Sequence, residues 1–165
     1  MRIALSTDHA GFEKLKQLKE FLSSSGHECI NYGPTSFDSD DDYPDFIRPA
    51  AEAVASGECE VGIIFGGSGQ GEAMTANRVK GVRCAVYYGS AKAVDAVDVS
   101  GSSAADEYEI LRLSKLHNNA NMLSLAGRFL NNEAIELAVS IWLNTNFENE
   151  ERHVRRIAKI DGENS

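Results

Sequence analysis

Short apolar runs alternate with helical patterns of apolar residues along most of this 165-residue chain. A run of consecutive bulky apolar residues is typical of a strand buried on both faces, whereas apolar residues spaced three and four apart indicate a helix that buries one side. The apolar runs predict five strands, over 2–6, 28–32, 61–65, 83–88 and 121–125. Helical spacing predicts helices over 12–22, 44–55, 72–79 and 132–143, followed by a separate charged helix over 148–160.

Strands that alternate with helices predict an α/β fold, in which a parallel sheet is covered by helices on both faces. No internal repeat and no linker divides the chain, so residues 1–165 are expected to form a single domain. The segment 89–106 stands apart, because it is rich in Ala, Ser, Asp and Val and has no periodic pattern. Ligands of such sheets bind beyond the carboxyl ends of the strands, so the loops that follow the strands should carry the chemistry.

The composition, with 42% apolar and 25% charged residues, is typical of a globular protein. A formal net charge of −9 argues against nucleic acid as a partner, because phosphate backbones require a cationic surface. No stretch approaches the roughly 18 apolar residues of a membrane span. Arg2 is followed at once by the apolar run 3–5, which leaves no room for a signal peptide, so a cytoplasmic location is expected.

The three cysteines, Cys29, Cys59 and Cys84, are far apart and form no C-x-x-C pair. Neither a disulfide framework nor a zinc site is therefore indicated, and we expect no metal. Cys29 and Cys84 lie in apolar runs, and both are expected to be small buried residues.

The glycine cluster 66–71, followed by Glu72, comes directly after the third predicted strand. Glycines there let successive backbone N–H groups point at one anion, and the next helix adds its positive N-terminus. The cluster is neither a Walker loop, since no Gly-Lys-Ser/Thr follows, nor a dinucleotide fingerprint, since Glu72 replaces the third glycine. Glu72 is therefore a candidate base beside an oxyanion cradle, although it also suits the start of any helix.

Two further polar clusters lie beside predicted strands. Asp8 and His9 end the first strand and could hold hydroxyls and an anion, unless Asp8 only caps the next helix. His117 begins the polar run 117–121 before the fifth strand, and its imidazole could act as an acid or base near neutral pH. An isolated histidine is more often structural than catalytic, so that alternative stays open.

A cationic stripe lies on the last predicted helix. Its members fall at i, i+3, i+4 and i+7, so they share one face: Arg152, Arg155, Arg156 and Lys159. Arginine forks suit a phosphate dianion. The alternative is a solvated helix face.

Taken together, these segments resemble the ribose-5-phosphate isomerase B family, which includes the galactose-6-phosphate isomerase subunits. The matching motifs follow the family order and cover nearly the whole chain apart from 89–106: Asp8-His-Ala-Gly11, Asp42-Tyr-Pro-Asp45, Gly67-Ser-Gly-Gln-Gly-Glu-Ala-Met-Thr-Ala-Asn77, Gly81-Val-Arg83, His117-Asn-Asn-Ala-Asn121, Gly127-Arg128 and Arg152-His-Val-Arg-Arg156.

The resemblance implies a Rossmann-like three-layer α/β/α sandwich with a five-stranded parallel sheet and a C-terminal helix. It also implies a homodimer or a tetramer with active sites shared between subunits, in which the segment 148–160 reaches the partner. The implied activity is aldose–ketose isomerisation of ribose 5-phosphate and ribulose 5-phosphate through an enediolate. This chemistry requires neither a cofactor nor a metal.

The same resemblance assigns roles to individual residues. Glu72 would be the base, His117 would open the sugar ring, and Ser68 would help to stabilise the enediolate. The remaining residues would bind the substrate: Asp8 its hydroxyls, Gly67, Gly69, Gln70 and Gly71 its enediolate, Asn118 the sugar, and His9, Arg128, Arg152 and Arg156 its phosphate.

The chain departs from the family pattern in two places. Many members carry a cysteine base at the position that matches Gly66, so this chain resembles the branch whose base is a glutamate after the glycine loop. The segment 89–106 resembles an insertion that reshapes the sugar end of the pocket. The substrate could therefore be galactose 6-phosphate, allose 6-phosphate or a tetrose phosphate, or the chain could bind a sugar phosphate without turnover.

Overall fold

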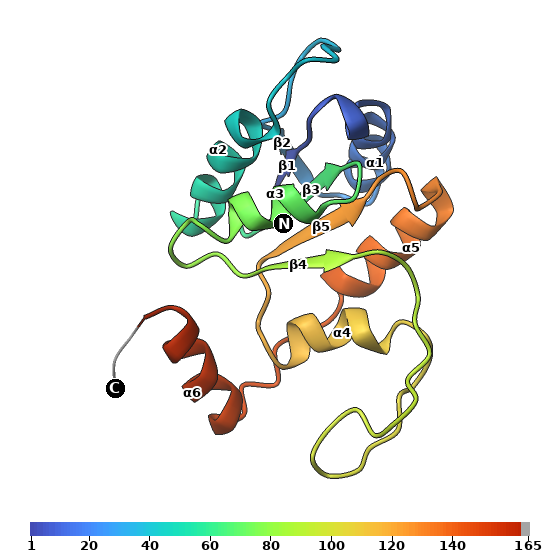
Figure 1. The fold of residues 1–165 in the computed structure, drawn as a ribbon, viewed down its shortest axis with the longest axis vertical. Coiled ribbons are helices and arrows are strands. Elements are labelled where there is room, and N and C mark those ends of the chain that lie inside the picture. Colours follow the sequence, from blue (N-terminus) through green and yellow to red (C-terminus); the bar gives the residue numbers. More distant parts are fainter. Residues whose placement is uncertain (163–165) are drawn as a thin grey trace. The chain divides into compact units, whose positions relative to one another are not determined.

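The computed structural model describes residues 1–162 (Figure 1). The chain groups into two compact units. The first, called here the sheet unit, comprises Met1–Tyr88 and Ala120–Glu136. The second, called the helical unit, comprises Gly89–Asn119 and the chain from Leu137 onward. The expectation of a single domain over 1–165 stays a prediction.

The sheet unit contains five parallel strands, as the apolar runs predict. In chain order these are β1 (Arg2–Ser6), β2 (Glu28–Asn31), β3 (Val61–Gly66), β4 (Cys84–Tyr87) and β5 (Met122–Ala126). The strand order is β2-β1-β3-β5-β4, so the chain moves outward from β1 to β2 and then returns to place β3 on the other side of β1. Such a reversal leaves a crevice beyond the carboxyl ends of the two strands that flank it.

Helices cover both faces of this sheet, which confirms the predicted Rossmann-like α/β fold (Figure 1). A short 3₁₀ turn, η1 (His9–Gly11), leads into α1 (Phe12–Ser24), which packs on β1 and β2. On the other face, α2 (Tyr43–Ala55) and α3 (Gln70–Ala76) pack on each other and on the central strands. The first residues of α5 (Asn132–Leu143) also belong to this unit.

The core beneath α2 follows from the alternation of side chains along the strands. Ala4, Ile64 and Met122 point to the same face and are fully buried against Ile47 of α2. Truncating one of the large side chains in such a core typically costs about 2–5 kcal/mol. The carboxyl ends of β1, β3 and β5 are thus held by a rigid, close-packed layer.

The helical unit contains α4 (Glu109–Leu116), the remainder of α5 and α6 (Glu151–Ile160). Trp142 of α5 is fully buried, and its indole N–H donates a 3.1 Å hydrogen bond to the Ser114 hydroxyl. The Lys115 ammonium lies 3.9 Å from the centre of the same indole, and burial lowers the pKa of Lys115 to about 8. Within the part of the chain that the structure describes, no helix has the length and apolar character needed to cross a bilayer.

The structure differs from the sequence predictions in several local features. The charged helix predicted over 148–160 begins only at Glu151. The helix α4 was not predicted, because eight residues are too few for a clear period. The helix α3 begins at Gln70 and ends three residues before Val79, where the Asn77 side chain turns away to bond the backbone of Cys84. The expectation for Cys29 and Cys84 was wrong: both are half-buried because β2 and β4 are edge strands.

Candidate active site

A pocket of about 470 Å³ lies at the carboxyl ends of β1 and β3 in the sheet unit. It gathers eight of the thirteen predicted site residues, together with three that were not predicted. Its lining is Asp8, His9, Ala10, Tyr43, Gly67, Ser68, Gln70, Gly71, Glu72, Met74 and Arg128. The position is the one that a reversal of strand order predicts for a ligand.

Glu72 lies in the first turn of α3, and only 5% of its surface is exposed. Its carboxyl group is folded back over the end of β3: a Cβ atom built on Gly66 would lie 1.9 Å from the Glu72 Cδ. Burial raises the pKa of Glu72, and the nearby negative charge of Asp8 adds to the increase. A carboxylate whose pKa is shifted toward neutrality is a stronger base than an ordinary glutamate.

The loop before Glu72 is held in a fixed conformation. Gly69 has a φ of +75°, a left-handed conformation that side chains disfavour, and its carbonyl accepts a 2.7 Å hydrogen bond from the Ser124 hydroxyl. The Gln70 N–H donates to the Ser68 hydroxyl at 3.4 Å. Gly69 is not among the residues that line the pocket, and it sets the turn that presents its neighbours, so its predicted contact with substrate stays a prediction.

His9 forms a close pair with Asp41, a residue that sequence reasoning did not single out. The His9 Nδ1 lies 2.7 Å from the Asp41 Oδ1, which also accepts the His9 backbone N–H at 3.2 Å. The hydrogen bond to Asp41 raises the pKa of His9, and the charge of Asp8 adds to the increase. The imidazole is therefore biased toward its cationic form, which suits an anionic ligand.

Asp8 caps the turn after β1 and also faces the pocket. Its Oδ1 accepts a 2.9 Å hydrogen bond from the Ala10 N–H, and so caps the turn η1. Its Oδ2 lies 3.9 Å from the His9 Nδ1 and lines the pocket. The cap fixes the carboxylate at the carboxyl end of β1 and leaves it in the lining of the pocket.

Arg128 brings a second cation to the His9 side of the pocket. It follows β5, and its backbone N–H donates to the Gly67 carbonyl at 3.1 Å. Its guanidinium lies against Gly67. The positive charge of Arg128 lowers the pKa of His9, as expected for two cationic groups that lie near each other. The pocket therefore has a buried carboxylate and a cationic region.

Tyr43 and Met74 line the pocket but were not predicted. Tyr43 begins α2, and a Cβ atom built on Gly71 would lie only 2.7 Å from its hydroxyl oxygen. The motif 42–45 contained this tyrosine, but nothing in its sequence context distinguished a pocket side chain from a core one. A small residue at 71 is required for the close approach.

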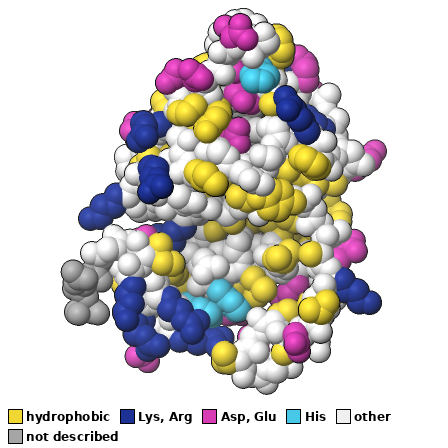
Figure 2. All heavy atoms as spheres, viewed as in Figure 1, with side chains coloured by type: hydrophobic (Ala, Val, Ile, Leu, Met, Phe, Trp, Pro, Cys, Tyr) yellow, Lys and Arg dark blue, Asp and Glu magenta, His cyan; other side chains and the backbone are white. Residues whose placement is uncertain are grey.

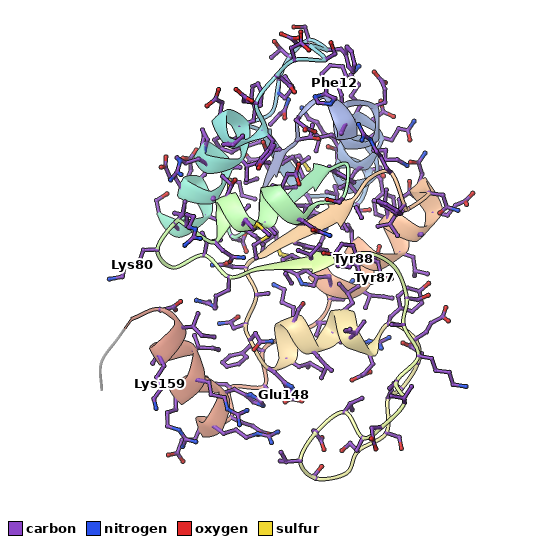
Figure 3. All side chains as sticks on the ribbon, viewed as in Figure 1. Phe12, Lys80, Tyr87, Tyr88, Glu148 and Lys159 are labelled. Atoms are coloured by element: carbon purple, nitrogen blue, oxygen red, sulfur yellow. The ribbon has the colours of Figure 1, made fainter. Side chains whose placement is uncertain are left out.

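The other four predicted residues, His117, Asn118, Arg152 and Arg156, belong to the helical unit. Dark-blue cationic side chains gather on α6 beside cyan histidines in Figure 2. The predicted stripe is not uniformly solvated: Arg152 is partly buried, with its Nε 2.6 Å from a Glu150 oxygen, whereas Arg156 is exposed. Figure 3 labels Lys159 on α6 and Glu148 in the segment that leads to it.

The family model described as Ribose/Galactose Isomerase matches residues 3–102 and 89–160. The chain belongs to the ribose/galactose isomerase family. The resemblance drawn from the sequence motifs is thereby confirmed. Both matched ranges include residues 89–102, which form most of the predicted insertion.

Named members of the ribose/galactose isomerase family align with nearly the whole chain. Ribose-5-phosphate isomerase B of Mycobacterium leprae (strain TN) is 36% identical over 157 residues, which cover 95% of this chain and 86% of that protein. The solved structure of the Clostridium thermocellum enzyme has a TM-score of 0.83 and 34% identity, covering 98% and 96% of the two chains. The solved structure of Mycoplasma genitalium ribose-5-phosphate isomerase B with bound ribulose-5-phosphate has a TM-score of 0.83 and 33% identity, and the match covers 98% of this chain and 94% of that chain.

Proposed function

We propose that this chain is an aldose–ketose isomerase that interconverts ribose 5-phosphate and ribulose 5-phosphate through an enediolate. The observation that carries the proposal is the buried carboxylate of Glu72 beside the glycine loop, in a pocket that also holds His9 and Arg128. A base, a set of backbone donors and a cationic region are the three elements that a phosphorylated sugar requires for this reaction.

The reaction is balanced by proton transfers alone. Glu72 removes the proton from C2 of the open-chain aldose, and the electron pair forms the enediolate with its negative charge on O1. A proton returned to C1, together with transfer of the hydroxyl proton from O2 to O1, gives the ketose. A carboxylate alone cannot make that carbon acid ionise at a useful rate. The donors of the loop, with Ser68, must stabilise the developing oxyanion, and each well-placed donor contributes about 3–4 kcal/mol.

The cationic region of the pocket suits the phosphate. Arg128 offers a planar fork of N–H donors that matches phosphate oxygens, and His9 adds a charge-assisted donor. Asp41 acts through His9, because its hydrogen bond favours the imidazolium and fixes the ring orientation. Asp8, held by its backbone cap, would receive the sugar hydroxyls.

We further propose that the active enzyme is a homodimer or a tetramer of dimers with shared sites. His117, Asn118, Arg152 and Arg156 all belong to the helical unit, so the proposed ring-opening acid and the phosphate-binding arginines come from the same part of the chain. In this arrangement, the segment 148–160 completes the pocket of a partner subunit. We place the enzyme in the cytoplasm, where its three free cysteines would stay reduced.

The segment 89–106 is the reason to test sugars other than ribose 5-phosphate. It is irregular in the structure, and its base is closed by a 2.8 Å hydrogen bond from the Ala91 N–H to the Glu107 carbonyl. We propose that this loop is an insertion that selects the sugar. Galactose 6-phosphate, allose 6-phosphate and a tetrose phosphate are the alternatives.

A panel of aldose phosphates with four to six carbons tests the proposal directly. Ketose formation from each sugar is measured with the wild-type protein and with Glu72→Gln. We expect the highest kcat/KM with ribose 5-phosphate, and we expect Glu72→Gln to lose this activity. If only a hexose or a tetrose phosphate is turned over, that sugar is the substrate and ribose 5-phosphate is not. If sugars bind but none is turned over, the chain is a sugar-phosphate-binding protein and not an enzyme.

A further inference from the structure

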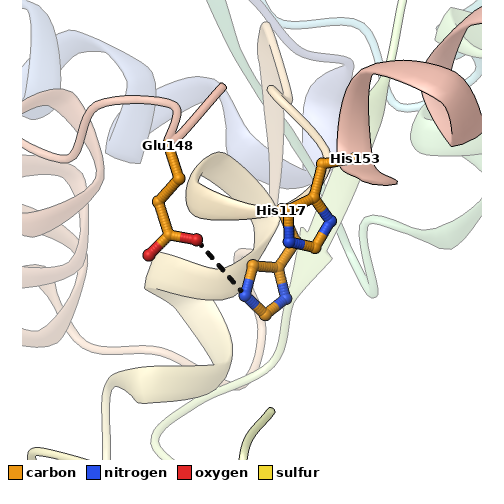
Figure 4. A group of neighbouring side chains, drawn as sticks. All are labelled: His117, Glu148 and His153. Carbon is orange, nitrogen blue, oxygen red and sulfur yellow. Dashed lines mark ion pairs between the residues drawn. The ribbon is translucent and has the colours of Figure 1, made fainter. Parts of the chain in front are cut away.

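Three side chains that can bind a metal meet in the helical unit, although their positions in the sequence gave no sign of it. His117 ends α4, Glu148 lies in the segment before α6, and His153 lies in the first turn of α6. One ligand atom of each lies within 4.8 Å of the others (Figure 4). The sequence predicted no metal because its cysteines form no pair, and these three residues are separated by 31 and 5 positions.

The backbone holds the three side chains together. The Glu148 N–H donates a 3.2 Å hydrogen bond to the carbonyl of Leu116, which places Glu148 beside the end of α4. The His117 Nε2 lies 3.7 Å from a Glu148 carboxylate oxygen. The rings of His117 and His153 stack with their centres 4.2 Å apart and their planes 13° apart. The arrangement is thus built by two helix ends and the chain that joins them.

His153 provides an independent observation that the cluster lacks a component. Only 3% of its surface is exposed, and its Nε2 is one of the buried polar atoms without a hydrogen-bond partner among residues 1–162. The nearest carboxylate oxygen to this nitrogen, from Glu150, is 3.8 Å away and is already engaged by Arg152 at 2.6 Å. A buried ring nitrogen with no partner costs free energy unless a further group satisfies it.

We propose that His117, Glu148 and His153 form a binding site for zinc or a similar divalent transition metal, and that its occupation inhibits the isomerase. Two imidazoles and one carboxylate are an established ligand set for such ions, with a fourth position left for water. Zinc bonds of about 2.0–2.2 Å separate neighbouring ligands by about 3.3 Å, so these side chains must close by an ångström or so. One of the two stacked rings must also rotate, so that a lone pair of each points at the ion. The inhibitory part rests on the proposed function, because zinc would withdraw His117 from ring opening.

Charges around the site set the expected strength of binding. The neighbouring cations Arg152, Arg155 and Arg156 repel a divalent ion, but the pairing of Arg152 with Glu150 reduces this effect. Both imidazoles must be neutral to bind the ion. The proposed site is therefore one for regulation or inhibition by free metal and not one for a permanently bound structural ion.

Direct metal binding is measured first, because it does not depend on any activity. The chelator-treated protein is titrated with Zn²⁺ against a chromophoric zinc indicator in a buffer without phosphate. We expect one equivalent per chain, and we expect Glu148→Gln and His153→Ala to bind at least 10–100-fold more weakly. Glu151→Gln is the matched control, because it removes an exposed carboxylate from the same helix turn and should bind like the wild type.

Co²⁺ provides a spectroscopic check, since a four-coordinate site with histidine ligands gives visible absorption bands that Glu148→Gln should lose. Equal zinc binding by the wild type, Glu148→Gln and a folded His153→Ala protein would overturn the site.

The inhibitory step is tested with the same variants once isomerase activity has been measured in chelator. Micromolar Zn²⁺ should reduce wild-type turnover, whereas the turnover of Glu148→Gln, compared with its own rate in chelator, should resist the inhibition. If zinc binds stoichiometrically but turnover is undiminished, the proposed inhibition is wrong and the proposed metal site stands. A protein inactive in chelator would instead contradict the proposed function, and the binding titration would still decide the metal site.

Discussion

Replacing Glu72 with glutamine removes the proposed base and changes little else. Glutamine has the same length and branching, keeps the helix start, and fills the volume over Gly66 that the carboxylate occupies. The phosphate contacts proposed for His9 and Arg128 are untouched, so KM should stay within a few-fold of the wild type. The loss should appear in kcat.

The expected size of the loss follows from the environment of the carboxylate. General-base catalysis contributes about 10²–10⁴-fold. Burial raises the pKa of Glu72 and so brings it nearer to the pH at which the enzyme works. We therefore expect a loss in the upper half of that range. Since each decade corresponds to about 1.4 kcal/mol, the barrier should rise by roughly 4–5.5 kcal/mol. The donors of the loop remain, so some rate above the uncatalysed reaction should persist.

Stability should respond in the opposite direction from activity. A carboxyl whose pKa is raised in the folded protein binds its proton more tightly there than in the unfolded chain. Ionising it therefore costs stability above the raised pKa, and the cost disappears as the pH falls below the ordinary value for glutamate. Glu72→Gln should melt at the same temperature or higher at pH 7–8, and the difference should vanish in acid.

The assay is a pH profile of kcat/KM for ribose 5-phosphate, together with melting curves at each pH. The wild type should lose activity on an acid limb whose midpoint lies above the ordinary glutamate value, and the variant should lack that limb. Cys84→Ser is the control, because burial raises the pKa of this thiol and keeps it neutral. A variant of Glu72 with most of its turnover, or a Cys84 variant without any, would refute the assignment of the base.

Three further predictions concern other parts of the site. Asp41→Asn should lower the pKa of His9, so KM for the sugar phosphate should rise at pH 7–8 and return toward the wild-type value near pH 6, whereas an unchanged pH dependence would contradict the pairing. Mixing an Arg156→Ala chain with a Glu72→Gln chain should restore part of the activity, and verified heterodimers without recovery would exclude shared sites. Deleting 89–106 should leave the circular dichroism spectrum and melting transition intact but alter sugar preference; unchanged specificity would place the loop outside the pocket.

The sequence predicts the sheet well because each strand contains a run of apolar residues. Val61–Gly66 is buried at every position. The same signal overestimates burial at the edges of the sheet, where Cys29 and Cys84 have neighbours on one side only. Strand order, which decides what is an edge, depends on long-range pairing that a local pattern does not contain.

The pocket was predicted where a residue type is unusual for its local context. Glu72 stands at a position where a dinucleotide loop has glycine, and this mismatch pointed to the base. Asp41 was missed because it lies in the acidic run 38–42, where any member could have been the one that meets His9. The fold selects Asp41 by placing its Oδ1 2.7 Å from the ring, and only the three-dimensional path of the loop determines that choice.

The overlap between Glu72 and the space above Gly66 makes glycine at 66 a condition for the present position of the carboxyl group. A Cβ atom at 66 would lie 1.9 Å from the Glu72 Cδ, so a larger residue there would force the Glu72 side chain into another rotamer. The family resemblance gives a cysteine at this position as the base of many members. In this chain such a cysteine would displace the carboxyl group of the proposed base, so the two positions are coupled through one shared volume.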